Sequence, residues 1–197
     1  MKVAIIGATG FLGKSLVNEF TNRNHQVTAI SRTAQDSDKE NLQYVAVDVL
    51  NIEALAEVLK GNDAVVSAFN PGWTNPNIYA DFLAGAKAIQ EAVKRSGVKR
   101  LITIGGAGSL YINGSQLVDG PDFRADIKPG ATAAREYLDI IKEEKELDWA
   151  FFSPAIEMHQ GITTGRTGNY RLGLENPVFN EENRSILSGE DVAVVLA

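Results

Sequence analysis

The chain lacks cysteine and has only two histidines among its 197 residues. Disulfides and thiolate metal sites are therefore excluded, and we predict no bound metal. The net charge is −6, and no cluster of Lys and Arg is followed by an aromatic array, so we expect no binding to nucleic acid. No apolar run approaches the ~20 residues that span a bilayer. An apolar strand also begins within three residues of the N-terminus, so we expect no membrane helix, no signal peptide and a cytoplasmic location.

The composition is that of a globular protein, with 44% hydrophobic and 22% charged residues. At this length we predict a single domain over residues 1–197 with a substantial core. Ser188 with Asp191 three residues later is typical of a helix N-terminus, and it predicts a helix over 191–197. This helix stops after about two turns. We therefore expect a further C-terminal segment in the natural protein.

The first thirteen residues carry the clearest functional pattern. An apolar run over 3–6 leads directly into Gly7-Ala8-Thr9-Gly10-Phe11-Leu12-Gly13, and apolar residues at helical spacing follow over 14–20. Glycines permit a tight turn and close approach of a ligand, while the free N–H groups of a new helix favour a phosphate. The order strand, glycine turn, helix therefore predicts a dinucleotide site. The residues expected to contact the cofactor here are Gly7, Thr9, Gly10, Phe11, Leu12 and Gly13.

The remaining chain alternates short apolar strands with helices. The pattern predicts strands over 26–30, 42–47, 64–69, 101–104 and 149–152, and helices over 51–60, 81–96 and 131–146. Only crossover helices connect neighbouring parallel strands, so this alternation predicts an α/β fold, a doubly wound parallel sheet of Rossmann type in three αβα layers. Ligands of such sheets lie beyond the carboxyl ends of the strands.

Two connections are unusually long, over residues 105–130 and 153–188. Both begin at the carboxyl end of a predicted strand. We expect them to form a small lobe that builds the substrate pocket; the alternative is that they are surface insertions. The helix end over 142–146, rich in Glu and Lys, is interpreted as solvated.

The residues after the second and third strands indicate which dinucleotide binds. Arg32 stands where an NAD enzyme usually has an acid, and its guanidinium suits a 2′-phosphate, with Ser31 and Thr33 adding hydroxyl donors. NADP(H) is therefore favoured over NAD(H), although Arg32 could also open a solvated loop. Asp48 could accept from the adenine with Val49 beside the ring, or it could instead cap the following helix.

The loops after the fourth and fifth strands should border the rest of the cofactor. Trp73 and Tyr79 could stack on a flat substrate, with core or rim packing as the alternative. Adjacent glycines leaving a strand allow a bulky group against the backbone, so we expect the nicotinamide near Gly105 and Gly106. The cofactor-binding residues predicted in these two loops are Ala68, Phe69, Asn70, Gly105, Gly106 and Ala107.

Several motifs together resemble a known family. The glycine turn, Arg32, the stretch over 105–110, Trp149 to Ala155 and Arg166 to Gly173 are similar to the NmrA-like, atypical short-chain dehydrogenase/reductases. Within that family they resemble the NADH-flavin reductase group and, more distantly, biliverdin/flavin reductases. The resemblance implies a Rossmann fold, a nicotinamide dinucleotide and reduction of flavin or another flat acceptor. It also places the turn of Ser153, Pro154 and Ala155 beside the nicotinamide.

The chain departs from the usual catalytic pattern of short-chain dehydrogenases. They use a Tyr and a Lys four residues apart on one helix, whereas Tyr137 and Lys142 are five apart and point about 140° away from each other. Tyr137 is therefore interpreted as a packing residue. If a protein group assists, Ser109 and His159 are the candidates, because both lie on the long loops.

Arg171 could meet an anionic group such as a flavin phosphate, or it could support its loop through a salt bridge. A turn and a short strand are expected over 166–173. Two functions remain open. The first is an NAD(P)H-dependent reductase of flavin or a similar flat, small-molecule acceptor. The second is a non-catalytic NADP(H)-binding redox sensor of NmrA type, with a protein partner. We expect no membrane partner and a monomer or homodimer.

Overall fold

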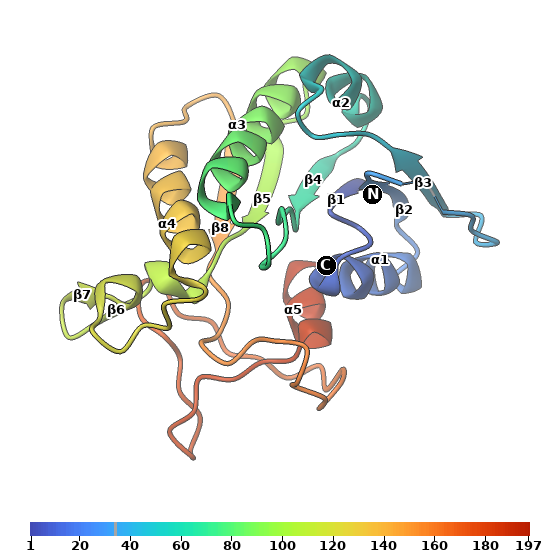
Figure 1. The fold of residues 1–197 in the computed structure, drawn as a ribbon. Helices are drawn as coiled ribbons and strands as arrows, with labels where there is room; N and C mark the ends of the chain where they lie inside the picture. Colours follow the sequence, from blue (N-terminus) through green and yellow to red (C-terminus); the bar gives the residue numbers. More distant parts are fainter. Residues whose placement is uncertain (34) are drawn as a thin grey trace.

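The computed structural model describes residues 1–33 and 35–197, and its centre is a parallel sheet of six strands. The strands are β1 (Lys2–Ile6), β2 (Gln26–Ser31), β3 (Leu42–Ala46), β4 (Ala64–Ser67), β5 (Arg100–Ile104) and β8 (Asp148–Phe152). Their order is β3-β2-β1-β4-β5-β8 (Figure 1). The order reverses between β1 and β4, which confirms the doubly wound fold and places its crevice there.

Helices cover both faces of the sheet. On one face, α1 (Phe11–Asn22) packs against α5 (Gly189–Leu196). On the other, α3 (Ile78–Ser96) lies between α2 (Ile52–Leu59) and α4 (Lys128–Lys142), as Figure 1 shows. None of the helices among the described residues has the length and apolarity that would let it cross a membrane.

Alternation along the strands builds the two halves of the core. In β1, Val3 and Ile5 join the cluster under α1, whereas Ala4 and Ile6 join the cluster under α3 and α4. Successive side chains of a strand point to opposite faces, so a strand covered on both sides must be apolar throughout. This explains why β1 is apolar at every position after Lys2 instead of alternating with polar residues.

The two long connections lie beyond the carboxyl ends of the strands (Figure 1). The first contains two short 3₁₀ turns, η1 (Ala107–Ser109) and η2 (Leu117–Asp119), and a hairpin of β6 (Tyr111–Ile112) and β7 (Ser115–Gln116). The second is joined to this hairpin, because the Tyr111 N–H donates to the Glu175 carbonyl at 2.8 Å and the Asn176 amide donates to the Tyr111 carbonyl at 2.8 Å. The prediction of a short strand over 166–173 was wrong, since these residues form no strand.

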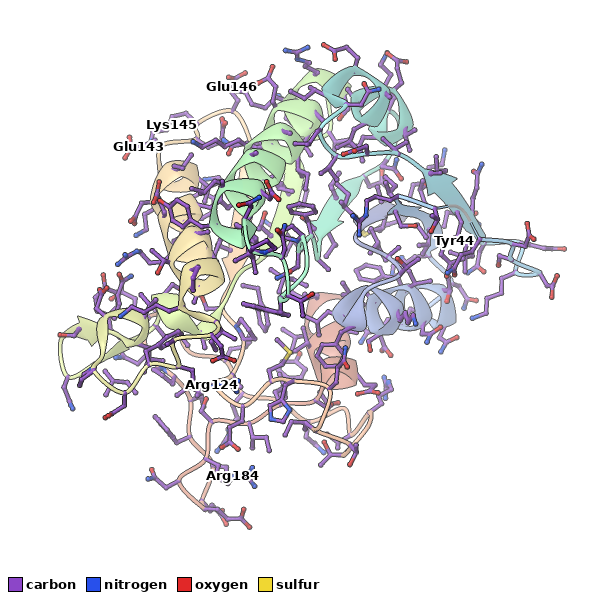
Figure 2. The ribbon with its side chains drawn as sticks, viewed as in Figure 1. Tyr44, Arg124, Glu143, Lys145, Glu146 and Arg184 are labelled. Carbon is purple, nitrogen blue, oxygen red and sulfur yellow. The ribbon has the colours of Figure 1, made fainter. Side chains whose placement is uncertain are left out.

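The acidic segment over 143–146, which the sequence predicted to be helical, follows α4 and is only partly solvated. Glu143, Lys145 and Glu146 project outward (Figure 2). Glu144, however, has a side chain only 5% exposed, and it accepts a hydrogen bond from the Gln90 amide of α3 at 2.8 Å. The interpretation of this whole end as solvated was therefore wrong for Glu144. The Glu146 N–H that donates to its carboxylate, with Gln90 and Lys94, lowers the pKa of Glu144 to about 2 despite desolvation.

Glu144→Gln should flatten the dependence of stability on acid pH. A carboxylate with a lowered folded pKa stabilises the fold above its unfolded pKa of 4.5, and this contribution disappears as pH falls toward about 2. We expect the wild-type protein to lose on the order of 2 kcal/mol more than the variant across this range, by urea unfolding at each pH. Glu143→Gln is the control, because Glu143 is exposed. Parallel curves for wild type and Glu144→Gln would contradict this assignment.

Candidate functional site

The glycine turn between β1 and α1 is possible only without side chains. Gly7 has φ +79°, and a Cβ there would lie 2.6 Å from the Ala68 carbonyl oxygen of the loop after β4. A Cβ on Gly13 would lie 2.0 Å from the Gly7 carbonyl oxygen. Contacts this close to backbone atoms cannot be relieved by side-chain movement, so any larger residue would separate β1, α1 and β4.

The start of α1 supplies N–H donors that have no partner within the helix. Gly10 occupies the N-cap position and has no side chain to accept a hydrogen bond. The first bond within the helix runs from the Lys14 N–H to the Gly10 carbonyl at 3.1 Å, so the N–H groups of residues 11–13 precede the helical ladder. Their number and direction suit a pyrophosphate, and the narrow glycine turn leaves room for one. The residues present therefore fit a dinucleotide.

The loop after β2 differs in detail from its prediction. The Ser31 hydroxyl donates to the Thr33 carbonyl at 2.5 Å, so its hydrogen is already used within the loop. The expectation that Ser31 adds a donor for a phosphate is therefore corrected. Arg32 and Thr33 are exposed, and Arg32 forms no ion pair with another described residue. The guanidinium of Arg32 is thus available to an anion.

The loop after β3 shows which residue caps α2. The side chain of Asn51, not that of Asp48, caps α2 by accepting from the Ala54 N–H at 3.1 Å. The suggestion that Asp48 caps this helix was wrong; one oxygen of its carboxylate accepts from the Leu50 N–H at 2.9 Å within a turn. Val49 packs against the core. The adenine role of Asp48 and Val49 stays a prediction.

The loop after β4 runs beside the glycine turn. Ala68 lies against Gly7, and the Phe69 ring fills the space above Gly85 of α3, where a Cβ would lie 2.3 Å from the ring. Asn70 closes the turn by accepting from the Gly72 N–H at 2.8 Å. This loop is therefore packed in place and holds its backbone next to the crevice.

Two aromatic residues continue this edge. Trp73 packs against Gly130 at the start of α4, yet 56% of it is exposed. Tyr79 is 39% exposed, and its hydroxyl donates to the Glu136 carboxylate, which raises the pKa of Tyr79. Both residues are partly exposed and offer flat surfaces to solvent. Their role in stacking on a substrate stays a prediction.

The two glycines after β5 have different neighbours. A Cβ on Gly105 would lie 1.9 Å from the Phe151 ring of β8, so the protein itself fills this space. A Cβ on Gly106 would meet no atom of the described residues within 4 Å. Of the predicted nicotinamide neighbours, Gly106 is thus the open position, and Ala107 begins η1 directly after it.

Two predicted serines meet at this edge. Ser109 is 5% exposed, and its Oγ lies 2.8 Å from the Oγ of Ser153, which follows β8. Pro154 is buried and Ala155 is partly buried. The structure therefore brings together the serine from the first long connection and the turn from the second.

His159 and Arg171 are not part of this cluster. His159 is exposed, and its Nδ1 accepts from the Gly161 N–H at 3.1 Å within its own turn. Arg171 is exposed and forms no ion pair with any described residue, so the salt bridge considered as its alternative role is not seen. Their roles in catalysis and substrate binding stay predictions.

Tyr137 lies in the core, as interpreted. It is 1% exposed, and its hydroxyl forms no hydrogen bond of normal geometry with the described residues. Burial raises the pKa of Tyr137, although the Thr103 side chain lies close enough to lower this pKa in part. Lys142 is exposed and pairs with Asp139 at 3.2 Å. The Tyr137 hydroxyl cannot reach a substrate, and α4 carries no Tyr/Lys pair.

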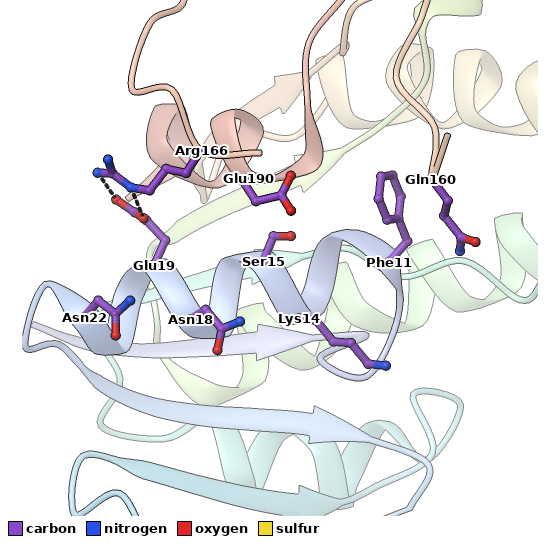
Figure 3. A pocket seen from close by; sticks show the side chains of 9 residues that line it. All are labelled: Phe11, Lys14, Ser15, Asn18, Glu19, Asn22, Gln160, Arg166 and Glu190. Atoms are coloured by element: carbon purple, nitrogen blue, oxygen red, sulfur yellow. Dashed lines mark hydrogen bonds and ion pairs between the residues drawn. The ribbon is translucent and has the colours of Figure 1, made fainter. Parts of the chain in front are cut away.

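Ion pairs that sequence reasoning missed hold the second long connection. Arg166 binds Glu19 of α1 with two hydrogen bonds of 2.8 and 2.9 Å (Figure 3). Arg23 adds a third at 2.9 Å. Arg166 principally, and then Arg23, lower the pKa of Glu19. In the sequence, the one sign of this ion pair was that Glu19 falls on the apolar side of α1, between Val17 and Phe20.

Asp191 forms a second anchor. Its carboxylate accepts from the Thr167 N–H at 2.9 Å, the Gly168 N–H at 2.8 Å and the Thr167 hydroxyl at 2.6 Å. The predicted helix cap is confirmed, since the Ser188 Oγ accepts from the Asp191 N–H at 3.0 Å. The same short motif therefore starts α5 and fixes the loop.

A polar groove of about 520 Å³ runs between α1 and this loop (Figure 3). It begins at Phe11 and Lys14, near the glycine turn, and continues past Asn18 to the pair of Glu19 and Arg166. The groove follows the outer side of α1, whereas the glycines and serines described above lie at the carboxyl ends of the strands. We therefore place the candidate site at the strand ends.

The fold and this arrangement define a Rossmann protein with a site for a nicotinamide dinucleotide. A model of the NAD(P)H-binding family matches residues 7–197. The chain therefore belongs to this family, among the NmrA-like, atypical short-chain dehydrogenase/reductases. Its relatives are oxidoreductase-like.

Three relatives illustrate this membership. The uncharacterized protein YwnB of Bacillus subtilis is 33% identical over 201 residues, which cover 100% of this chain and 90% of YwnB. A proposed epimerase from Bacteroides thetaiotaomicron is 41% identical, with a TM-score of 0.89 over 99% of this chain and 88% of that one. A proposed NADH-flavin reductase from Streptococcus pneumoniae is 35% identical, with a TM-score of 0.86 over 100% of this chain and 90% of that one.

Tyr137→Phe should leave dinucleotide affinity unchanged and raise the free energy of unfolding by up to about 1 kcal/mol, because it removes a buried hydroxyl without a partner. Tyr137→Ala is the contrast, with a cost of about 3–5 kcal/mol for the cavity. Urea unfolding and titration with NADPH measure both effects. A large loss of affinity in Tyr137→Phe would place the hydroxyl in the site.

Proposed function

We propose that this protein is an NAD(P)H-dependent reductase of flavin or a similar flat acceptor. The observation that carries the proposal is the burial of Tyr137, which leaves α4 without the acid-base pair that alcohol oxidation requires. A bound NAD(P)H supplies a hydride. A reduced flavin can then take its proton from water, so the protein contributes mainly by positioning.

Two exposed aromatic side chains favour a flat acceptor. Trp73 is held against Gly130 while more than half of it stays exposed, and Tyr79 is fixed nearby on α3 by Glu136. Aromatic faces held in this way can stack on a ring system. The proposed activity of the Streptococcus pneumoniae relative is of the same kind. We also propose that the protein acts in the cytoplasm.

We further propose that NADP(H) is preferred. Arg32 is exposed at the end of β2 with no ion pair to another described residue, and a guanidinium binds a phosphate through parallel hydrogen bonds. The pyrophosphate is held by the turn over 7–13, and the nicotinamide half by the loops after β5 and β8. Exposed Arg171 is the candidate contact for an anionic acceptor.

A second candidate function is a redox sensor that reports the dinucleotide to a partner protein. The observation that favours it is a short run of exposed apolar side chains in the second long connection, where Tyr170 is 45%, Leu172 68% and Leu174 96% exposed. Exposed apolar side chains gathered on one segment are typical of an interaction surface. Turnover separates the two functions, since both need the cofactor.

The purified protein should consume NADPH only when FMN is added, and faster than it consumes NADH. Absorbance at 340 nm follows the reaction, with parallel runs lacking flavin or protein. Tight NADPH binding without turnover on FMN, FAD or riboflavin would contradict the reductase and favour the sensor.

Arg32→Ala should weaken NADPH binding about tenfold or more and NADH binding less than about twofold, because only NADPH carries the phosphate that Arg32 meets. Calorimetric titration measures both affinities. Arg124→Ala is the matched control, since Arg124 is exposed on the first long connection and pairs with Asp126. Equal losses for the two dinucleotides would refute the assignment of Arg32.

A further inference from the structure

Residues 169–174 form a segment of the second long connection, the strap, that is held at both ends. Just before the strap, two backbone N–H groups donate to the Asp191 carboxylate of α5 at 2.9 and 2.8 Å. Just after it, the Glu175 carbonyl accepts from the Tyr111 N–H of β6 at 2.8 Å. The strap therefore joins α5 to the hairpin of β6 and β7 (Figure 1).

The backbone of the strap is straight and open to solvent. Residues 162–173 contain neither a turn nor a bend, and no residue of 169–173 has a positive φ. The N–H and carbonyl groups of residues 170–174 form no backbone hydrogen bond with any described residue. All the residues of the strap are exposed. The strap is thus an extended segment of the kind that can pair with another strand.

The strap presents an apolar stripe to solvent. Side chains alternate between the two sides of an extended chain, so Tyr170, Leu172 and Leu174 share one side. The other side rests on the protein at Gly173, where a Cβ would lie 2.8 Å from the Val178 side chain. The stripe therefore points away from the protein, and Leu174 at its end is 96% exposed. Contact with water is unfavourable for such side chains, and a partner surface would remove it.

Two charged side chains accompany this stripe. Arg171 and Glu175 are exposed, and neither forms an ion pair with a described residue. Residues four apart meet on a helix, but an extended chain separates them. An antiparallel copy of the strap, aligned about Gly173, places Arg171 opposite Glu175. The same alignment places Leu172 opposite Leu174. The strap is therefore complementary to itself in charge and in apolarity, which favours a second copy of this chain over a different protein.

We propose that the strap is the surface through which two copies of this chain associate about a two-fold axis. At this axis, Gly173 has no side chain to keep the two backbones apart. The Glu175 carbonyl is directed at Tyr111. Backbone groups of alternate residues point to opposite edges, so those of Leu172 and Leu174 are free for a short antiparallel ladder. The contact is isologous, so each pair of side chains occurs twice.

The expected affinity follows from the size of the contact. About five residues per copy bury less surface than the ~1,200–2,000 Å² of a standard stable interface. We therefore expect a dissociation constant of roughly 10–100 µM. The inference does not rest on the proposed function, although it gives Arg171 a partner other than an anionic acceptor.

Sedimentation equilibrium of the purified protein, from about 5 to about 500 µM, measures this constant. Leu172→Asp should weaken association about tenfold or more, because it places two carboxylates in the apolar contact. Leu50→Asp is the matched control, since Leu50 is 60% exposed before α2 and introduces the same charge. It should change the constant by less than about twofold.

An exchange of charges tests the alignment. Arg171→Glu and Glu175→Arg should each weaken association about fivefold or more, because each sets like charges opposite one another at two places. The double variant restores opposite charges with exchanged positions. It should return to within about twofold of the wild-type constant, whereas damage to the structure by one substitution would not be reversed by the other.

Three results would contradict the proposal, once thermal unfolding has shown that each variant is folded. The first is a wild-type protein that stays monomeric at about 500 µM, which would leave the stripe to a different protein. The second is unchanged association of Leu172→Asp, because the copies would then meet elsewhere. The third is a double variant that associates no better than the single ones, which would leave Arg171 to the acceptor.

Flavin-dependent turnover is measured separately. The expected association without consumption of NADPH in the presence of FMN would support the strap and refute the reductase. Turnover by a protein that stays monomeric would support the reductase and refute the strap.

Discussion

The fold depends on the close approach of three backbone segments around Gly7. The end of β1, the first turn of α1 and the loop after β4 meet at distances that exclude a Cβ on Gly7 or Gly13. This contact sets where α1 begins and which N–H groups have no partner within the helix. It also sets the position of Ala68 and the packed ring of Phe69. The dinucleotide site and the crevice between β1 and β4 are therefore consequences of one packing constraint.

Much of the fold could be predicted from the sequence because the strands are covered on both faces. Strands of this kind must be apolar at nearly every position, as β1 is from Val3 to Ile6, and crossover connections leave a helical pattern between them. The glycine spacing identified the cofactor end for the same reason, since it reports a steric requirement of the local chain. Arg32 could be named as a candidate because its position after β2 is fixed by that topology, and its role toward a 2′-phosphate stays a prediction.

Other features depend on contacts that no local pattern encodes. Glu144 is held by Gln90, 54 positions away, so a helix end rich in charge gave no sign that one carboxylate is enclosed. Glu19 and Arg166 are separated by 147 positions. The role of Ser31 was misjudged because its hydroxyl satisfies the backbone of its own turn, and Asp48 because Asn51, three residues on, takes the cap. In each case the choice among partners was made by the folded geometry.

Two anchors hold the second long connection against the helices on one face of the sheet. The first turn of α1 is the predicted phosphate site, while Glu19 near its other end binds Arg166, and Asp191 on the adjacent α5 binds the residues that follow Arg166. The stretch between the end of β8 and these anchors is thus a closed loop with fixed ends. Its sequence can diverge among relatives and suit a different acceptor while the cofactor half stays the same. Relatives that act on different acceptors would then differ in this loop and share the sheet and the glycine turn.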